Sequence, residues 1–120
     1  MQVLGVRRNT ANKPDFVDEI YSFEELDKVL ARADYLILAV PLTDQTRHMI
    51  NRETLAKMKP NAYLLNVGRG ELVDTQALID ALRSKMIAAA GLDTMDPEPL
   101  PQDLSLIHIW SIRTRRFDRL

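Results

Sequence analysis

The chain has 120 residues, a hydrophobic fraction of 46% and a formal net charge of −1, which are ordinary values for one small globular domain or a piece of a larger one. The near-neutral charge gives no indication of nucleic-acid binding, and no apolar run approaches the roughly 18 residues of a membrane span. The absence of cysteine excludes disulfides, thiolate catalysis and cysteine metal sites, and it is typical of a cytoplasmic protein. We identify no metal-binding residues in the sequence.

The first predicted elements are a strand, a loop and a helix. Residues 2–6 form a short apolar run typical of a strand, and residues 8–18 are polar, with asparagine and proline, as in a loop. Ser22 is followed three residues later by Glu25, which is the pattern of a capping box at the start of a helix.

The middle of the chain predicts two further strands with a helix between them. Residues 35–40 are continuously apolar, as in a parallel strand buried on both faces, and Pro41 ends the run. Asn51 caps a short helix that Pro60 terminates, and residues 63–67 form the next apolar strand.

The last predicted helix and strand complete the alternation. Asp74 caps a helix that extends to about Ser84, and residues 87–92 form a strand. Strands alternate with helices and no tight hairpin is indicated, so the sequence predicts βαβ units and a parallel sheet of about four strands.

Each of the four predicted strands is followed by polar or constrained residues. In open parallel sheets, ligands bind beyond the carboxyl ends of the strands, so these segments are expected to converge on one site. The segments are Arg7-Arg8-Asn9, Pro41-Leu42-Thr43, Gly68-Arg69-Gly70 and residues 93–98.

The segment around Arg69 has the most specific pattern. Gly68 and Gly70 flank the arginine directly after an apolar strand, and glycine permits a sharp turn and a close approach of ligand to backbone. Arginine presents a rigid fork of donors that suits a carboxylate. On spacing alone, an ordinary turn arginine explains the pattern equally well.

Three ordered motifs resemble those of the D-isomer-specific 2-hydroxyacid dehydrogenases. Residues 67–74 resemble the arginine signature of this family, and residues 39–43 followed by Thr46 resemble its loop beside the cofactor. Residues 90–93, followed by residues 98–101, resemble its next signature. The resemblance covers residues 1–103 and implies an α/β fold, a partial Rossmann-like doubly wound parallel sheet.

The resemblance implies roles for individual residues. Arg69 matches the arginine that binds the substrate carboxylate and polarises the reacting carbonyl, and Glu98 matches the acid that raises the basicity of a catalytic histidine. Asp93 matches a residue that contacts the nicotinamide amide. The alternatives are a turn acid at Asp93 and a solvated loop charge at Glu98. Positions that line the cofactor are matched by Val40, Pro41, Leu42, Thr43, Val67 and Gly68.

Two features of the family pattern are missing. The four glycines do not form the phosphate-binding G-x-G-x-x-G. The catalytic histidine of the family follows a Thr-Pro pair, and no histidine of this sequence does. His108 lies too early in the chain to match it. We therefore expect a domain truncated at both ends and an isolated chain without activity. Residues 104–120, with four arginines and one acid, break the composition of the preceding residues and are interpreted as a non-family, translated artefact.

Arg7 and Arg8 stand where members that prefer NAD usually carry an acid for the ribose 2′-hydroxyl. Arginine accommodates a 2′-phosphate, so the sequence favours NADP over NAD, although two surface arginines are also common without such a role. The resemblance thus implies hydride transfer between NAD(P)H and a small 2-ketoacid or 2-hydroxyacid in a homodimeric parent. The alternative is a nucleotide-binding, corepressor-like module without enzymatic activity.

Overall fold

The computed structural model describes residues 1–8, 10–93, 109–111 and 118–119, the last two segments by their backbone alone. Strands and helices alternate over most of the described chain, as the sequence predicted. The elements are β1 (Leu4–Val6), β2 (Glu19–Tyr21), the 3₁₀ helix η1 (Phe23–Glu25), α1 (Leu26–Leu30), β3 (Tyr35–Leu38), α2 (Arg52–Ala56), β4 (Tyr63–Asn66), the 3₁₀ helix η2 (Gly70–Leu72), α3 (Thr75–Arg83), β5 (Ala89–Leu92), β6 (Ile109–Ser111) and β7 (Asp118–Arg119).

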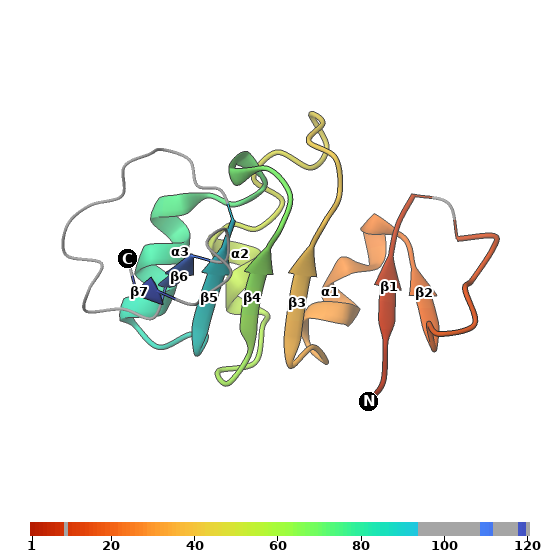
Figure 1. Cartoon of the computed structure of the whole chain (residues 1–120), viewed down its shortest axis with the longest axis horizontal. Coiled ribbons are helices and arrows are strands. Elements are labelled where there is room, and N and C mark those ends of the chain that lie inside the picture. The colour runs from red at the N-terminus through yellow and green to blue at the C-terminus, as the bar shows by residue number, and fades with distance from the viewer. Residues whose placement is uncertain (9, 94–108, 112–117, 120) are drawn as a thin grey trace.

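The strands form two sheets that are parallel except at one edge (Figure 1). β1 pairs with β2, and the second sheet has the order β3-β4-β5-β6-β7, in which only the pair β6–β7 is antiparallel. The predicted parallel α/β class is confirmed, but the prediction of about four strands is wrong. It omitted β2, which is only three residues long, and the pairing of β6 and β7.

The facing edges of β1 and β3 are not hydrogen-bonded to each other and leave a groove of about 480 Å³ between them. From this groove the strand order runs from β1 to β2 in one direction and from β3 through β4 to β5 in the other (Figure 1). The strand order thus reverses between β1 and β3, and at such a topological switch point open parallel sheets bind ligands beyond the carboxyl ends of the strands.

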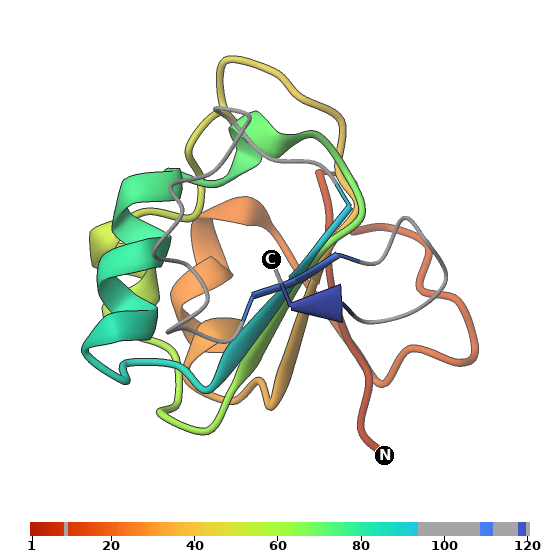
Figure 2. The same cartoon turned by 60° about the vertical axis from the view of Figure 1, so that its left-hand side comes forward.

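The helices α1, α2 and α3 lie on one face of the larger sheet (Figure 2). Alternate side chains of the strands, among them Leu36, Leu38 and Leu64, lie under the helices in one continuous core. This follows from the two-residue period of a strand. α3 contributes its apolar side chains to the same core, namely Ala77, Leu78, Ile79, Ala81 and Leu82.

The opposite face of β3 and β4 is exposed in the described structure. Tyr35 and Ile37 keep 63% and 60% of their surface accessible, and the rings of Tyr35 and Tyr63 stack with centroids 5.4 Å apart. The prediction that residues 35–40 are buried on both faces is therefore wrong for β3. A continuous apolar run does not reveal how many layers cover the strand that it forms.

Side-chain caps begin the helices where the sequence predicted them. The backbone N–H of Ser22 donates to Glu25 Oε1 (3.2 Å), and Asn51 Oδ1 accepts from the backbone of Glu53 (3.0 Å). Asp74 Oδ1 accepts from the backbone N–H of Ala77 at 3.3 Å. These bonds satisfy amide groups that have no partner within the first turn of a helix, which sets where each connecting loop ends.

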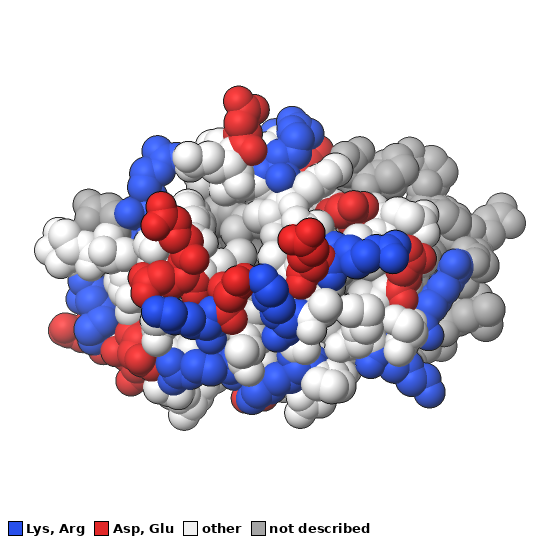
Figure 3. All heavy atoms as spheres, turned by 180° about the vertical axis from the view of Figure 1, so that it is seen from behind, with Lys and Arg blue, Asp and Glu red and all other residues white. Residues whose placement is uncertain are grey.

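Charges of both signs alternate over the helix-covered face, and neither sign forms a continuous patch there (Figure 3). Several are paired across elements, as in Lys57–Asp27 at 2.7 Å and Lys59–Asp34 at 3.2 Å. Among the described residues, no helix is long and apolar enough to cross a membrane, and no group of three acidic or histidine side chains could hold a metal ion.

Candidate functional site

The carboxyl ends of β3, β4 and β5 remain side by side beyond the strands. The N–H groups of Val67 and Gly68 donate to the carbonyl of Leu38 at 3.0 and 3.2 Å, and the N–H of Asp93 donates to the carbonyl of Asn66 at 3.0 Å. A Cβ added to Gly68 would lie 3.3 Å from the carbonyl oxygen of Val40. The structure therefore brings three predicted positions together at the carboxyl end of the sheet: Val40, Gly68 and Asp93.

The turn between β4 and η2 is built around the buried side chain of Asn66. Its Oδ1 accepts from the backbone N–H of Gly68, and its Nδ2 donates to the carbonyl oxygen of Arg69, both at 3.0 Å. An added Cβ at position 68 would lie 2.8 Å from Leu72 Cδ1, so a larger residue there would force the Leu72 side chain to move. Sequence reasoning did not select Asn66, since an asparagine at a strand end is common and only its burial reveals what it contacts.

Arg69 projects from this turn into solvent. Its side chain is 67% exposed, and its only ion pair among the described residues is a 3.4 Å contact with Glu71. Such exposed pairs contribute little free energy, so the guanidinium can exchange this contact for a ligand carboxylate. The backbone is well anchored while the side chain remains accessible, as a group that captures a small anion requires.

The loop after β3 is closed by hydroxyl groups. The buried Thr46 donates its hydroxyl to the carbonyl of Pro41 (2.7 Å) and accepts from the backbone N–H of Thr43 (2.7 Å). Pro41 and Thr43 are exposed, as is Val67 on the neighbouring turn, whereas Val40 and Leu42 pack partly against the core. The predicted cofactor positions of this loop thus divide into surface groups and supporting groups.

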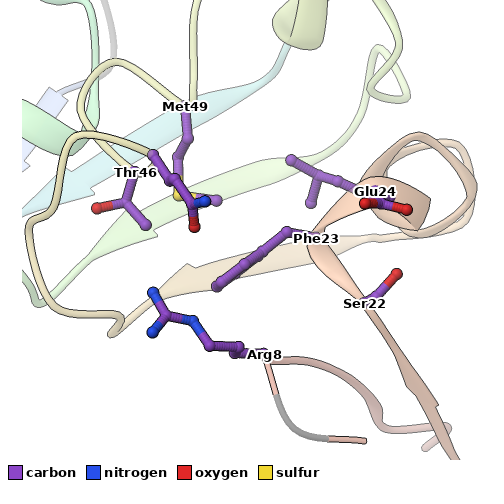
Figure 4. Close-up of a pocket in the computed structure, with 8 residues that line it drawn as sticks. Arg8, Ser22, Phe23, Glu24, Thr46 and Met49 are labelled. Carbon is purple, nitrogen blue, oxygen red and sulfur yellow. The ribbon is translucent and has the colours of Figure 1, made fainter.

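A pocket of about 660 Å³ lies where the end of β1 approaches this loop. Arg8 and Phe23 point towards the loop that carries Thr46 and Met49 (Figure 4). The pocket therefore spans the switch point, with one wall from each side. The lining residues are Arg8, Ser22, Phe23, Glu24, Leu26, Gln45, Thr46 and Met49.

The two predicted phosphate-binding arginines occupy different environments. Arg8 is exposed and lines the pocket, whereas Arg7 is partly buried and is not among the lining residues. Arg7 Nε is buried without a hydrogen-bond partner in the described structure. Sequence reasoning missed Ser22, Phe23 and Glu24 as pocket residues because it did not predict β2, whose end carries them into position.

The capping box beside the pocket also changes the acidity of Glu25. The backbone N–H of Ser22 donates to its carboxylate, and with a weaker contribution from Lys28 it holds the pKa of Glu25 below its usual value. Hydrogen bonds to the charged form favour ionisation. Glu25 therefore stays ionised and holds the β2–η1 turn, which carries Ser22, Phe23 and Glu24, at the pocket wall.

Several predicted positions lie outside the described residues: Glu98, the boundary after Asp103, and His108, which was considered and rejected as the catalytic histidine. The role of Glu98 and the boundary after Asp103 stay predictions.

Comparisons with known proteins agree on one family. Residues 1–113 match the profile described as D-isomer specific 2-hydroxyacid dehydrogenase, NAD binding domain. Glyoxylate/hydroxypyruvate reductase B from Enterobacter agglomerans is 58% identical over 83 residues, which cover 69% of this chain and 26% of that protein. This chain therefore spans about a quarter of the length of that relative.

Two solved structures extend the agreement to three dimensions. A D-isomer specific 2-hydroxyacid dehydrogenase from Xanthobacter autotrophicus Py2, in complex with NADPH and MES, has a TM-score of 0.83 and 36% identity over 92% of this chain and 46% of that chain. An NADPH-dependent glyoxylate/hydroxypyruvate reductase from Sinorhizobium meliloti, in complex with NADP and malonate, has a TM-score of 0.78 and 31% identity over 90% of this chain and 34% of that chain.

Proposed function

Because the chain belongs to the D-isomer specific 2-hydroxyacid dehydrogenase family, through its NAD binding domain, we propose that it forms part of a reductase of small 2-ketoacids. Glyoxylate and hydroxypyruvate are the substrates we favour, since relatives at 58% and 31% identity carry both in their names. The observation that carries the proposal is the exposed side chain of Arg69 on an anchored turn. This turn lies at the carboxyl end of the sheet, where Gly68 and Asp93 also lie.

The described residues fit one end of a dinucleotide. The 660 Å³ pocket lies at the switch point and has both apolar walls, from Phe23 and Leu26, and polar groups, from Ser22 and Arg8. Val40, Pro41, Leu42, Thr43, Val67, Gly68 and Asp93 would line the remainder of the cofactor, which supplies the hydride when bound. The 120 residues contain no G-x-G-x-x-G, so we assign no pyrophosphate site to them.

Arg69 would bind and orient the ketoacid. Its planar fork matches a carboxylate bidentately, which fixes direction as well as position, and its positive charge stabilises the negative charge that develops on the reacting carbonyl oxygen. Glu98 would hold the proton of a catalytic histidine supplied by a further part of the enzyme, because an acid beside imidazole favours the protonated form.

Arg8 supports NADP as the preferred cofactor. It is the only cation among the residues that line the pocket, and an exposed guanidinium suits a ribose 2′-phosphate. Arg7 belongs to the same proposal as a supporting charge, since it lies beside Arg8 and outside the pocket lining. Glu24, an acid in the lining, acts in the opposite direction, so the preference depends on the balance between it and Arg8.

A chimera tests the role of Arg69. Residues 4–93 of this chain would replace the matching segment of the Sinorhizobium meliloti reductase. The resulting protein is called the chimera, and its reduction of glyoxylate would be measured. Arg69→Ala should lower kcat/KM about 10²- to 10³-fold and leave the Kd for NADPH unchanged. Arg52→Ala, on the helix-covered face and exposed, is the matched control. An Arg69→Ala chimera with unchanged kcat/KM would remove Arg69 from the reaction.

The isolated chain should not reduce glyoxylate at a measurable rate. Its 120 residues contain neither the glycine-rich loop nor a histidine after Thr-Pro, and loss of a general acid alone costs about 10² to 10⁴ in rate. The same proposal places the parent enzyme in the cytoplasm as a homodimer, and the molar mass of the full-length enzyme from light scattering would test the dimer. The reductase and dehydrogenase relatives give no support to the corepressor alternative.

We also propose that residues 1–103 form the NAD(P)-binding unit and that residues 104–120 are not needed for it. A chain cut after Asp103 should then melt at the same temperature as the full chain. The contact that could make this wrong is the parallel pairing of β6 with β5, from Ala90↔Ile109 to Leu92↔Ser111. A clear drop in melting temperature on truncation would show that this pairing stabilises the domain.

A further inference from the structure

The buried amide of Asn66 is the strongest feature near the proposed site to which no function has been assigned. We propose that Asn66 is a positioning residue that fixes the direction of Arg69, an inference that rests on the proposed role of Arg69 in binding the ketoacid. Asn66 occupies a buried position of β4 at which its neighbours on the same face, Leu38 and Leu64, are apolar. An amide at such a position is costly unless each polar atom is hydrogen-bonded.

Both polar atoms of the Asn66 side chain are bonded to the turn that follows. Oδ1 accepts from the N–H of Gly68 and Nδ2 donates to the carbonyl of Arg69, so one side chain joins both ends of the two-residue segment. The Gly68 N–H also donates to the carbonyl of Leu38, and the Arg69 carbonyl also accepts from the N–H of Leu72. The turn is therefore held between β3 on one side and η2 on the other, with Asn66 at its centre.

Asn66 is itself held by the sheet. Its backbone pairs with Leu38 of β3 and with Leu92 of β5, and its carbonyl accepts from the N–H of Asp93. Asn66 is fully buried, so a change of its rotamer would require the close-packed side chains around it to move. β4, which is paired with β3 and β5, therefore fixes the side chain of Asn66, and this side chain in turn fixes the backbone of Arg69.

Fixing the backbone matters because the Arg69 side chain has little else to orient it. Its contact with Glu71 is long and mostly exposed. Bidentate capture of a carboxylate requires a defined plane and direction of the guanidinium, and a misplacement of about 1 Å can cost roughly 10²-fold in rate. A residue that only stabilised the core would not selectively affect the contact between the Arg69 guanidinium and the ketoacid carboxylate.

The first test uses the unsubstituted chain. Proton exchange of the two asparagine side-chain amides would be measured by NMR at Asn66 and at Asn61, which is exposed at the other end of β4. The Asn66 amide should exchange at least about tenfold more slowly, because it is buried and donates to the Arg69 carbonyl. Equal rates would overturn the inference, whether or not any variant folds.

The second test is a double-mutant cycle in the chimera. Asn66→Leu keeps most of the volume and removes both hydrogen bonds; it should lower kcat/KM for glyoxylate about 10- to 100-fold and leave the KM for NADPH unchanged. In the Arg69→Ala background it should cause no further loss, because Asn66 acts through Arg69. Asn61→Leu, the matched control, should be unchanged in both backgrounds.

Each other outcome decides against the inference. Effects of Asn66→Leu and Arg69→Ala that multiply would show that Asn66 does not act through Arg69. An unaffected Asn66→Leu chimera would show that the turn needs no amide. An Arg69→Ala chimera with full activity would instead refute the proposed function, and the positioning role would fall with it. Asn66→Ser, which leaves space for water, enters the same cycle if the leucine variant does not fold.

Discussion

The turns after β4 and after β1 both present an arginine, but they are supported in different ways. β4 has a paired strand on each side, and its turn is joined to the core through Asn66. β1 has a partner on one side only, β2, and its other edge faces the groove. In the proposed function, the turn that is supported on both sides orients the substrate, and the strand end with one unpaired edge contacts the larger cofactor.

Gly68→Ala should give the largest change in stability. The new Cβ would lie 2.8 Å from Leu72 Cδ1 and 3.3 Å from the carbonyl oxygen of Val40, and Leu72 is fully buried. Overpacking of this kind costs about 1–3 kcal/mol. Urea unfolding of the chain, followed by circular dichroism, would measure the shift in midpoint.

Gly5→Ala in β1 is the matched control for that variant. Its new Cβ would lie 3.4 Å from Val17 Cγ1, an ordinary contact, so the free energy of unfolding should change by no more than about 0.5 kcal/mol. Equal losses in the two variants would mean that the β4 turn is no more tightly packed than β1, and the contrast between the two turns would disappear.

Arg8→Ala should affect cofactor choice and leave stability almost unchanged. In the chimera the Kd for NADPH should rise about tenfold, which is roughly 1.4 kcal/mol, while the Kd for NADH stays the same. Arg7→Ala should have a smaller effect on NADPH because Arg7 does not line the pocket. Fluorescence titration with both cofactors measures this, and equal weakening for NADH and NADPH would end the 2′-phosphate proposal.

The smallest effect is expected at the edge of the β1–β2 sheet. The hydrogen bond from Arg32, then that from Tyr21, holds the pKa of Glu19 below its usual value, and the Arg32–Glu19 ion pair is 2.8 Å long. A lowered pKa means that the pair stabilises the fold above the ordinary pKa of glutamate, and that this stabilisation is lost as the pH falls through the pKa of Glu19 in the folded chain.

Arg32→Gln should therefore raise the pKa of Glu19 towards its usual value and reduce stability slightly at neutral pH, with no difference from the unsubstituted chain in strong acid. NMR titration of the Glu19 carboxyl carbon measures the pKa directly. Lys28→Gln is the control, since Lys28 pairs with Glu25. A Glu19 pKa that does not change in Arg32→Gln would show that the ion pair does not hold this edge in solution.

Local patterns in the sequence determined the helix starts, most of the parallel strands and the identity of the site segments. Ser22, Asn51 and Asp74 act as caps because a cap involves groups within three residues of one another. The motifs around Arg69 and Asp93 could be assigned to strand ends for the same reason, since apolar runs followed by glycine or acid are short-range features.

Tertiary structure alone decided which residues meet and which are covered. β2 was missed because three residues carry too little periodicity, and with it the wall of the pocket around Phe23 was missed. The exposed face of β3 could not be read from its sequence, because apolar side chains look alike whether or not a layer packs on them. The importance of Asn66 emerged only from its burial and its two bonds, which depend on neighbours brought together by the sheet.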